Sequence, residues 1–476
     1  MKKLIFFGAG NIGIQTLKLC LELGFKPDYF VDNSSKLWGT YCHGIKIISI
    51  DEILHLGQVQ ILITCDQVES ISRQLLEIGI NSEDIFACNT FFKMLNFIAK
   101  NIRDKLSCDN LSKGCNLSAT HQKPKVLFDL QYGFVLGGVE SWAVQMEEEL
   151  LCDKTDVKYI IPDTVFDLSD IVSDKVILFE SCSIKSIAER VRDGLYKIKK
   201  SVPCNIVCNF PSETCLIAGF AKLLWPEYIN LIAVVHNDEG VYYRSYGEMS
   251  TLIDYCLVTC DMMEKYFVKC GMDKEKIMRL TWMISCEEVL DREYSREGQP
   301  LSIGYAGRIV KEAKRLDLLI EIVRGLKEKN IDFQLNIAGN GEYEEELKKT
   351  LTSLSDSVHF VGTIKREYIA DFWKKQDIGI NCSDYEGRCI SRAESMASGA
   401  VPVVTDTSGV GDDMINGYHG YIVPIGDVDA MIERICYLYE HRGLLKVMGE
   451  RAHQIILQQN RDSDLNVMWK KIIKCW

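Results

Sequence analysis

Residues 384–399 are DYEGRCISRAESMASG, and they lie between two apolar runs, IGIN at 378–381 and VPVVTD at 401–406. The two runs predict parallel strands, and the small residues around Glu394 predict a helix between them. Glu386 and Glu394 are eight residues apart, a little over two helical turns, so the spacing predicts that both carboxylates share one helical face. In an open α/β sheet, ligands bind at the carboxyl ends of the strands, and we expect both carboxylates there.

The chemistry of this stretch favours a sugar ligand. An ionised carboxylate accepts two hydroxyl hydrogens in fixed geometry, as a sugar requires. Two ordinary glutamates on a solvated helix are the alternative, and this stretch alone does not separate the two interpretations.

The composition is that of a globular protein with several domains. The chain has 476 residues, of which 47% are hydrophobic and 26% charged, and this length predicts two or three domains. A net charge of −12 argues against nucleic acid as the main partner. The 19 cysteines include no C-x-x-C pair, and several lie in apolar runs, where a thiol acts as a small hydrophobe. We expect a reduced, cytoplasmic protein without a signal peptide or membrane span.

Residues 1–100 predict a small Rossmann-like domain. An apolar run leads into a glycine pattern, G-x-G-x-x-G, at Gly8, Gly10 and Gly13, and Asp32 ends the next strand. Such glycines let a pyrophosphate approach the helix N-terminus, and the aspartate can bind ribose hydroxyls. The unit resembles the N-terminal domain of bacterial amino-sugar acetyltransferases, which implies a bound sugar nucleotide. NAD binding, and a structural or docking role, remain alternatives.

Residues 101–122 are polar and predict a linker. Cys108, Cys115 and His121 lie in this segment, and their spacing favours free thiols over a metal site.

Residues 123–295 predict a second α/β domain. KVLFDL begins it, and Gly138 precedes a helix whose free N–H groups could hold a phosphate. His236 ends the strand LIAVVH, where it could contact a sugar hydroxyl or shuttle a proton; a histidine bonded within its own loop is the alternative. The basic run 190–200 could meet anionic lipid headgroups, although a solvated helix face explains it as well.

Residues 296–460 predict a third α/β domain. Arg308 ends its first strand and Lys314 follows six residues later, so the two cations could bind a diphosphate. Spacing alone makes Lys311 and Arg315 equal candidates. Gly339 and Gly341 predict a further loop that approaches a ligand closely. Apolar residues at helical spacing in 461–476 predict a helix that packs on another surface.

The last two domains resemble the GT-B glycosyltransferases, specifically the retaining family-4 group (glycosyl transferases group 1). The motifs in the third domain are GRIVKEAKRLDLLIE, IAGNGE, VHFVG, DYEG and AESMASGAVPVVTD; in the second domain they are LGGVE and AVVH. This resemblance runs from about residue 123 to the C-terminus. It implies that residues 461–476 cross back onto the second domain.

The resemblance also implies roles for individual residues. Arg308 and Lys314 would stabilise the leaving diphosphate, and His236 would contact the sugar near the reacting carbon. Glu386 would bind hydroxyls of the donor sugar, and Glu394 the nucleotide ribose. The implied donor site consists of Gly138, Arg308, Lys314, Gly339, Gly341, Glu386, Gly387 and Glu394, and the implied catalytic residues are His236, Arg308, Lys314 and Glu386.

Two departures from the family pattern stand out. Arg388 and Cys389 replace a phenylalanine–glycine pair, so a bulky cation could alter which sugar fits. The segment TWMISCEE, around Trp282, replaces the asparagine–glycine loop between the lobes.

The sequence therefore predicts a metal-independent, retaining transfer of a hexose or N-acetylhexosamine. The donor would be a nucleotide sugar, and the acceptor a glycan or lipid-linked saccharide at the inner membrane face. Fixed cations and helix-end amides would stabilise the departing diphosphate. An NAD-dependent sugar-modifying enzyme that uses the GAGNIG motif and a non-catalytic sugar-nucleotide scaffold are the alternatives.

Overall fold

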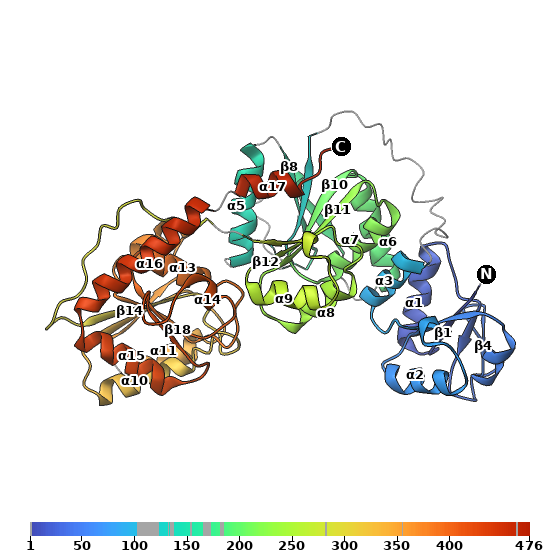
Figure 1. Cartoon of the computed structure of the whole chain (residues 1–476), viewed down its shortest axis with the longest axis horizontal. Helices are drawn as coiled ribbons and strands as arrows, with labels where there is room; N and C mark the ends of the chain where they lie inside the picture. Colours follow the sequence, from blue (N-terminus) through green and yellow to red (C-terminus); the bar gives the residue numbers. More distant parts are fainter. Residues whose placement is uncertain are drawn as a thin grey trace.

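The chain forms three α/β units in a row, each built on its own sheet (Figure 1). This computed structural model describes residues 2–101, 123–131, 133, 138–152, 155–164, 173–180, 185–280, 283–354, 356–462 and 465–476. We call the units the N-terminal unit, the first lobe and the second lobe, in chain order.

The N-terminal unit has a six-stranded sheet in the order β3-β4-β2-β1-β5-β6. Its elements are β1 Lys3–Phe7, α1 Asn11–Glu22, β2 Tyr29–Val31, β3 Tyr41–Cys42, β4 Ile45–Ile48, β5 Val59–Ile63, α2 Val68–Glu77, β6 Ile85–Ala87 and α3 Phe91–Asn101. The sequence predicted the strands β1, β2, β5 and β6. It did not predict β4, or β3, which pairs with β4 in an antiparallel hairpin.

The first lobe has a seven-stranded parallel sheet in the order β13-β12-β11-β10-β7-β8-β9. Its elements are β7 Lys125–Asp129, α5 Gly138–Cys152, β8 Asp156–Pro162, β9 Val176–Phe179, α6 Ile187–Lys199, β10 Cys204–Cys208, α7 Glu213–Leu224, β11 Ile229–Val235, α8 Gly240–Glu248, β12 Tyr255–Val258, α9 Asp261–Lys269 and β13 Ile277–Arg279. Alternate residues of β7 enter two different cores, Leu127 on one face and Val126 and Phe128 on the other. Both faces are therefore covered, as its continuous apolar strands predict.

The second lobe has a six-stranded parallel sheet in the order β16-β15-β14-β17-β18-β19. Its strands are β14 Leu301–Ala306, β15 Phe333–Ala338, β16 Val358–Gly362, β17 Ile378–Asn381, β18 Val401–Thr405 and β19 Tyr421–Val423. Its helices are α10 Leu318–Glu328, α11 Glu344–Leu354, α12 Ile369–Trp373, α13 Ile390–Ala397, α14 Val410–Asp413, α15 Val428–Glu440 and α16 Gly443–Asp462. The strand order reverses between β14 and β17, and a crevice forms at such a point outside the carboxyl ends of the strands.

The N-terminal unit packs directly on the first lobe. Helices α1 and α3 contact α6, α7 and α8, and one apolar core runs through both units. Gly219 of α7 makes room for α3, because a Cβ there would lie 2.8 Å from Leu95 Cδ1. At the edge of the contact, Thr90 donates a hydrogen bond of 2.6 Å to Glu248. The two units therefore share a core rather than touching only through their surfaces.

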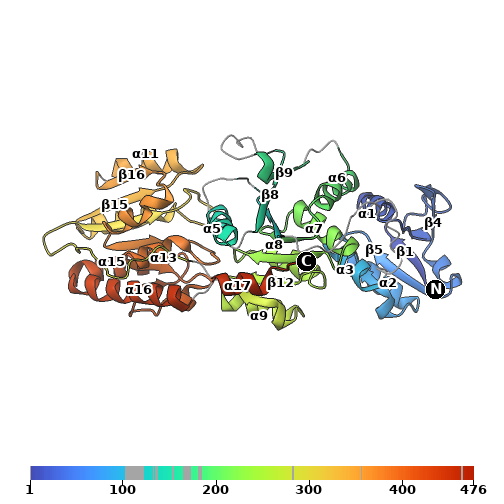
Figure 2. The ribbon, with the colours of Figure 1, turned by 90° about the horizontal axis from the view of Figure 1, so that it is seen from above.

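The end of the chain returns to the first lobe, where α17 Leu465–Ile472 lies beside α5 (Figures 1 and 2). Asn230 donates to the backbone oxygen of Ile472 at 2.7 Å, and the Lys474 amide donates to Asn205 at 2.9 Å. Among the described helices, none is both long and apolar enough to cross a bilayer.

Trp469 anchors this return. It is 3% exposed, and its ring lies 6.3 Å from Phe128 and 6.1 Å from Trp142. We expect Trp469→Ala to lower the free energy of unfolding by about 3–5 kcal/mol, as for other buried aromatic residues. Urea unfolding would measure the loss. Lys471→Ala, at an exposed position on the same helix, is the control and should change stability little; equal losses in both variants would contradict this role for Trp469.

Candidate functional site

The candidate site lies where the strand order of the second lobe reverses. The loop after β14 carries Lys314, and the loop after β17 carries Glu386. Lys314 Nζ lies 2.5 Å from Glu386 Oε1. The same oxygen accepts hydrogen bonds from Ser383 Oγ at 2.7 Å and Asn381 Nδ2 at 3.3 Å. Three donors on one oxygen fix the orientation of this carboxylate and leave Oε2 without a bond from any described residue.

The ion pair keeps both groups charged despite their burial. Burial by itself would raise the pKa of Glu386, but Lys314 and the hydrogen bonds from Ser383 and Asn381 outweigh it, so the pKa is lowered. Burial would likewise lower the pKa of Lys314, and the negative charge of Glu386 outweighs it, so that pKa is raised. The site therefore holds a fixed carboxylate and a fixed ammonium at neutral pH.

The structure separates the three basic candidates that the sequence left equal. Lys311 Nζ pairs with Glu346 at 2.9 Å, and Arg315 binds Asp317 and Asp384. Lys314 is thus the residue of the three that reaches Glu386.

Arg308 lies exposed two residues beyond β14, and Tyr305 Oη donates to its backbone oxygen at 2.9 Å. Its guanidinium forms no ion pair with the described residues. Arg308 therefore lies exposed at the same strand edge as Lys314.

Three of the four glycines in the predicted donor site, Gly339, Gly341 and Gly387, make close backbone contacts. A Cβ on Gly339, at φ +131°, would lie 1.9 Å from the backbone oxygen of Gly307, and one on Gly341 would lie 2.3 Å from that of Ile309. The sequence predicted that this loop approaches a ligand closely. In the structure, the loop instead lies close to the loop after β14. Gly387 touches the first lobe, since its Cβ would lie 1.8 Å from the backbone oxygen of His236.

His236 lies at the carboxyl end of β11, facing the second lobe. Its Nε2 is 2.9 Å from Asn209 Oδ1, and its ring packs edge-on against Trp142 at 5.1 Å. Asn209 donates through Nδ2 to the backbone oxygen of Asp129, so its Oδ1 accepts and Nε2 of His236 carries the proton. Burial lowers the pKa of His236 to about 3. The imidazole is therefore neutral at physiological pH.

Polar contacts join the two lobes next to His236. Ser408 Oγ donates to Asp238 Oδ2, and the backbone amide of Asp261 donates to Asp412 at 3.1 Å. Arg279 pairs with Asp412 as well. The lobes thus meet at the carboxyl ends of β11, β12, β13 and β18.

Glu394 does not share a helical face with Glu386, as the spacing predicted. Helix α13 begins at Ile390, so Glu386 belongs to the preceding loop and only Glu394 is helical. The prediction was wrong because residues 386–389 are not helical, and Gly387 lies against the backbone of the first lobe. Burial raises the pKa of Glu394 to about 7, against the opposing effect of the Arg366 charge.

Arg388 is turned away from the donor site. It pairs with Asp413 at 3.3 Å and donates to Gln459 at 2.6 Å, and Arg392 pairs with the same aspartate at 2.5 Å. The expectation that a cation in this turn alters which sugar fits is therefore not supported: Arg388 ties the turn to α14 and α16.

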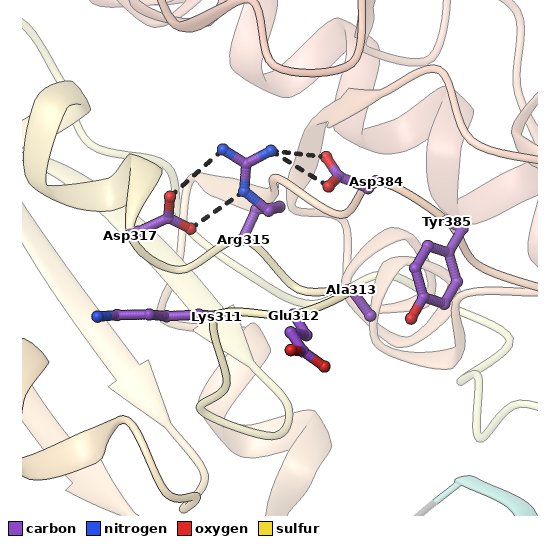
Figure 3. Close-up of a pocket in the computed structure, with 7 residues that line it drawn as sticks. All are labelled: Lys311, Glu312, Ala313, Arg315, Asp317, Asp384 and Tyr385. Atoms are coloured by element: carbon purple, nitrogen blue, oxygen red, sulfur yellow. Dashed lines mark hydrogen bonds and ion pairs between the residues drawn. The ribbon is translucent and has the colours of Figure 1, made fainter.

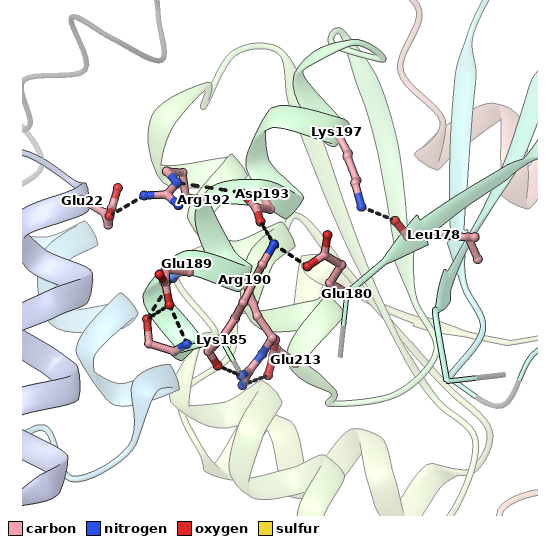
Figure 4. Close-up of polar contacts among 11 residues, drawn as sticks. Glu22, Leu178, Glu180, Lys185, Glu189, Arg190, Arg192, Asp193, Lys197 and Glu213 are labelled. Carbon is pink, nitrogen blue, oxygen red and sulfur yellow. Dashed lines mark hydrogen bonds and ion pairs between the residues drawn. The ribbon is translucent and has the colours of Figure 1, made fainter. Parts of the chain in front are cut away.

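Three basic side chains of α6 make polar contacts within the protein (Figure 4). Arg190 forms two bonds with Glu213, at 2.6 and 2.7 Å, and Arg192 reaches Glu22 of the N-terminal unit at 3.3 Å. Lys197 donates to the backbone oxygen of Leu178 at 2.7 Å. These contacts favour the interpretation of a structural helix face over a lipid-binding one.

In the N-terminal unit, one glycine of the motif packs against the backbone and another has free space beside it. A Cβ on Gly13 would lie 2.0 Å from the backbone oxygen of Gly8, itself at φ +111°, whereas one on Gly10 would meet nothing within 4 Å. Asp32 accepts from the amides of Ala9 and Ser34, both at 2.9 Å. Its carboxylate therefore holds the glycine loop itself, a role that the sequence did not suggest.

Asn381, Ser383 and Asn209 belong to the site, and sequence reasoning missed them. Asn381 is the last residue of β17 and Ser383 follows it. Their position at the carboxyl end of a strand is the sequence signal that could have placed them in the site. Cys108, Cys115, His121 and Trp282 lie outside the described residues. In the described part of the chain, no three His, Cys, Asp or Glu side chains gather as a metal site would require.

Two parts of the chain match models of known families. Residues 287–455 match the model described as glycosyl transferases group 1, and residues 1–86 match one described as C2185-like, N-terminal. The match to glycosyl transferases group 1 thus covers most of the second lobe.

Curated relatives agree with this domain. An uncharacterized glycosyltransferase of Methanocaldococcus jannaschii is 30% identical over 33% of this chain and 38% of its own length. A poly(ribitol-phosphate) alpha-N-acetylglucosaminyltransferase of Staphylococcus aureus is 25% identical over 35% of this chain and 34% of its own. A putative colanic acid biosynthesis glycosyltransferase of Salmonella typhimurium is 25% identical over 47% and 57%. The matches thus span between about a third and three fifths of these relatives.

Solved structures match both lobes. The pneumococcal O-GlcNAc transferase GtfA, solved with UDP and GlcNAc, aligns with a TM-score of 0.59 at 13% identity and covers 74% of this chain and 98% of its own. Anabaena HepE, solved with UDP-glucose, aligns with a TM-score of 0.57 at 15% identity and covers 71% and 97%. The two lobes have the GT-B fold.

The raised pKa of Glu394 predicts a pH-dependent stability. An unfolded carboxyl ionises near pH 4.3, so between about pH 4.5 and 7 the folded protein binds more protons than the unfolded chain does. Stability from this group is therefore present at low pH and lost as pH rises through that range. Glu394→Gln mimics the neutral acid at every pH. We expect the unfolding free energy of the wild type, relative to Glu394→Gln, to fall between pH 5 and 8, by at most about 3 kcal/mol.

Urea unfolding of both proteins at the two pH values measures this difference. The raised pKa of Asp129 affects both proteins equally and cancels. A difference that does not change with pH would show that Glu394 titrates normally.

Proposed function

We propose that this protein is a nucleotide-sugar-dependent glycosyltransferase. The observation that carries the proposal is the Lys314–Glu386 pair, with Arg308 exposed beside it at the strand edge where the order of the second-lobe sheet reverses. This edge offers two cations for a diphosphate and an oriented carboxylate for hydroxyl groups, which are the needs of a nucleotide-sugar donor.

Each residue has a role in the proposed reaction. Arg308 and Lys314 bind the diphosphate and stabilise the charge that develops on it as the bond to the sugar breaks. Glu386 accepts a sugar hydroxyl at Oε2, and Glu394 accepts ribose hydroxyls. His236, neutral and held by Asn209, contacts the sugar from the first lobe.

We propose retention at the anomeric carbon. The bond between that carbon and the diphosphate oxygen breaks, and its electron pair leaves with the nucleoside diphosphate. The acceptor oxygen forms its bond on the same face, and its proton passes to the departing phosphate oxygen. This route needs no carboxylate nucleophile, and the carboxylate of Glu386 is already paired with Lys314.

The donor sugar is a hexose or an N-acetylhexosamine, and the acceptor a glycan or lipid-linked saccharide in cell-surface polysaccharide assembly. The alpha-N-acetylglucosaminyltransferase relative and the colanic acid relative support these classes. Neighbours solved with UDP, UDP-glucose or GlcNAc make UDP sugars the first donors to test. Transfer takes place on the cytoplasmic side of the membrane.

Arg308→Ala tests the proposal. Loss of one preorganised electrostatic partner should lower kcat/KM by about 10²–10³-fold. The kcat/KM of Arg308→Lys should lie between that of the wild type and that of Arg308→Ala. Release of the diphosphate from UDP-, GDP-, ADP- and dTDP-sugars measures the rate, and NMR of the product gives the anomeric configuration. Arg324→Ala, an exposed arginine on α10, is the matched control and should retain the wild-type rate.

Three results would contradict this proposal. An unchanged rate in Arg308→Ala would remove its role at the diphosphate. An inverted product would exclude the same-face route. Nucleotide binding without release from any donor, with or without saccharide acceptors, would favour the scaffold alternative.

A further inference from the structure

The loop that carries Lys314 has an unusual backbone on both sides of that residue. Ala313 lies at φ 62° and Arg315 at φ 49°, in the left-handed region that favours glycine. Residues other than glycine keep such a conformation only where the surrounding structure determines it. Some contact must therefore hold this loop.

Arg315 supplies that contact (Figure 3). Its Nη1 donates to both carboxylate oxygens of Asp384, each at 3.1 Å. Its Nε and Nη2 donate to the two oxygens of Asp317, at 3.2 and 3.3 Å. One planar guanidinium thus bridges two aspartates, a geometry that a lysine ammonium cannot reproduce.

A backbone bond completes the connection between the two loops. The Asp384 amide donates to the backbone oxygen of Ala313 at 2.8 Å. Arg315 is next to Lys314 in the chain, and Asp384 precedes Glu386 by two residues. The contacts of Arg315 and this backbone bond therefore both join the loop that presents Lys314 to the loop that presents Glu386.

The same residues line a pocket of about 410 Å³ formed by the loops that carry Lys314 and Glu386. Its lining consists of Lys311, Glu312, Ala313, Arg315, Asp317, Asp384 and Tyr385. Figure 3 shows the guanidinium of Arg315 between the two aspartates, while Glu312 and Tyr385 extend from separate loops. Arg315 thus forms part of the wall, with its charge already neutralised by protein carboxylates.

We propose that Arg315 is a positioning residue: it holds the loops of Lys314 and Glu386 together and acts through that pair rather than on the substrate. The inference rests on the proposed function. Its physical basis is that small displacements of a catalytic pair are costly, since 1 Å can reduce a rate about 10²-fold.

Three variants separate the side-chain contacts from the backbone conformation. Arg315→Ala removes the side-chain contacts and keeps a non-glycine residue in the left-handed region. Arg315→Gly removes the same contacts and also relieves the backbone strain. Arg315→Lys retains the positive charge without the planar set of guanidinium donors. We expect Ala and Gly to lower kcat for donor hydrolysis by about 10- to 100-fold, with the donor KM changed less, and Lys to recover part of the loss. Arg461→Ala breaks an exposed ion pair with Glu288 and should leave kcat unchanged.

Hydrogen exchange provides a readout that does not depend on activity. Peptides covering 309–317 and 382–387 should exchange at least about tenfold faster in Arg315→Ala than in the wild type, while the rest of the second lobe keeps its protection. Wild-type exchange in both loops, or wild-type kcat in Arg315→Gly, would overturn the inference. If the wild type releases no diphosphate from any donor, the proposed function fails, and the exchange measurement alone decides the role of Arg315.

Discussion

The ion pair between Lys314 and Glu386 is the interaction on which the candidate site depends. A buried carboxylate is costly unless it is paired and hydrogen-bonded, and here a lysine, a serine and an asparagine supply three donors to one oxygen. Because both groups come from loops at the β14–β17 edge, the sheet topology brings them together. The strand order of the sheet thus places the two loops side by side, and the ion pair fixes the positions of their charges.

The second lobe supports this pair with close backbone contacts. Gly339 and Gly341 let the loop after β15 pack on the loop after β14, where any side chain would clash. Gly387 does the same between the lobes, against the backbone of His236. As a result, the residue that follows Glu386 lies directly against the backbone of the histidine in the first lobe.

Much of the fold follows from hydrophobic pattern and much of the site does not. The apolar runs predicted nearly all strands of the three sheets, because strands buried on both faces are continuously apolar. The hairpin of β3 and β4 and the brief β13 were not predicted, because Lys46 interrupts the apolar run of β4 and because β3 and β13 have only two and three residues. Among the site residues, Asn381 and Ser383 are small polar residues that acquire a role only through their distance from Glu386.

By itself, the sequence predicted three α/β units, the strand edge of the candidate site and its acidic residue Glu386, since strand period and motif spacing are local properties. Tertiary structure decided which of Lys311, Lys314 and Arg315 reaches Glu386, because side-chain direction depends on the left-handed turns around Lys314. It also decided that Arg388 points away from the site and that Glu386 lies outside the helix. These outcomes depend on partners distant in the sequence, such as Asp413 and His236, and spacing along one segment carries no information about them.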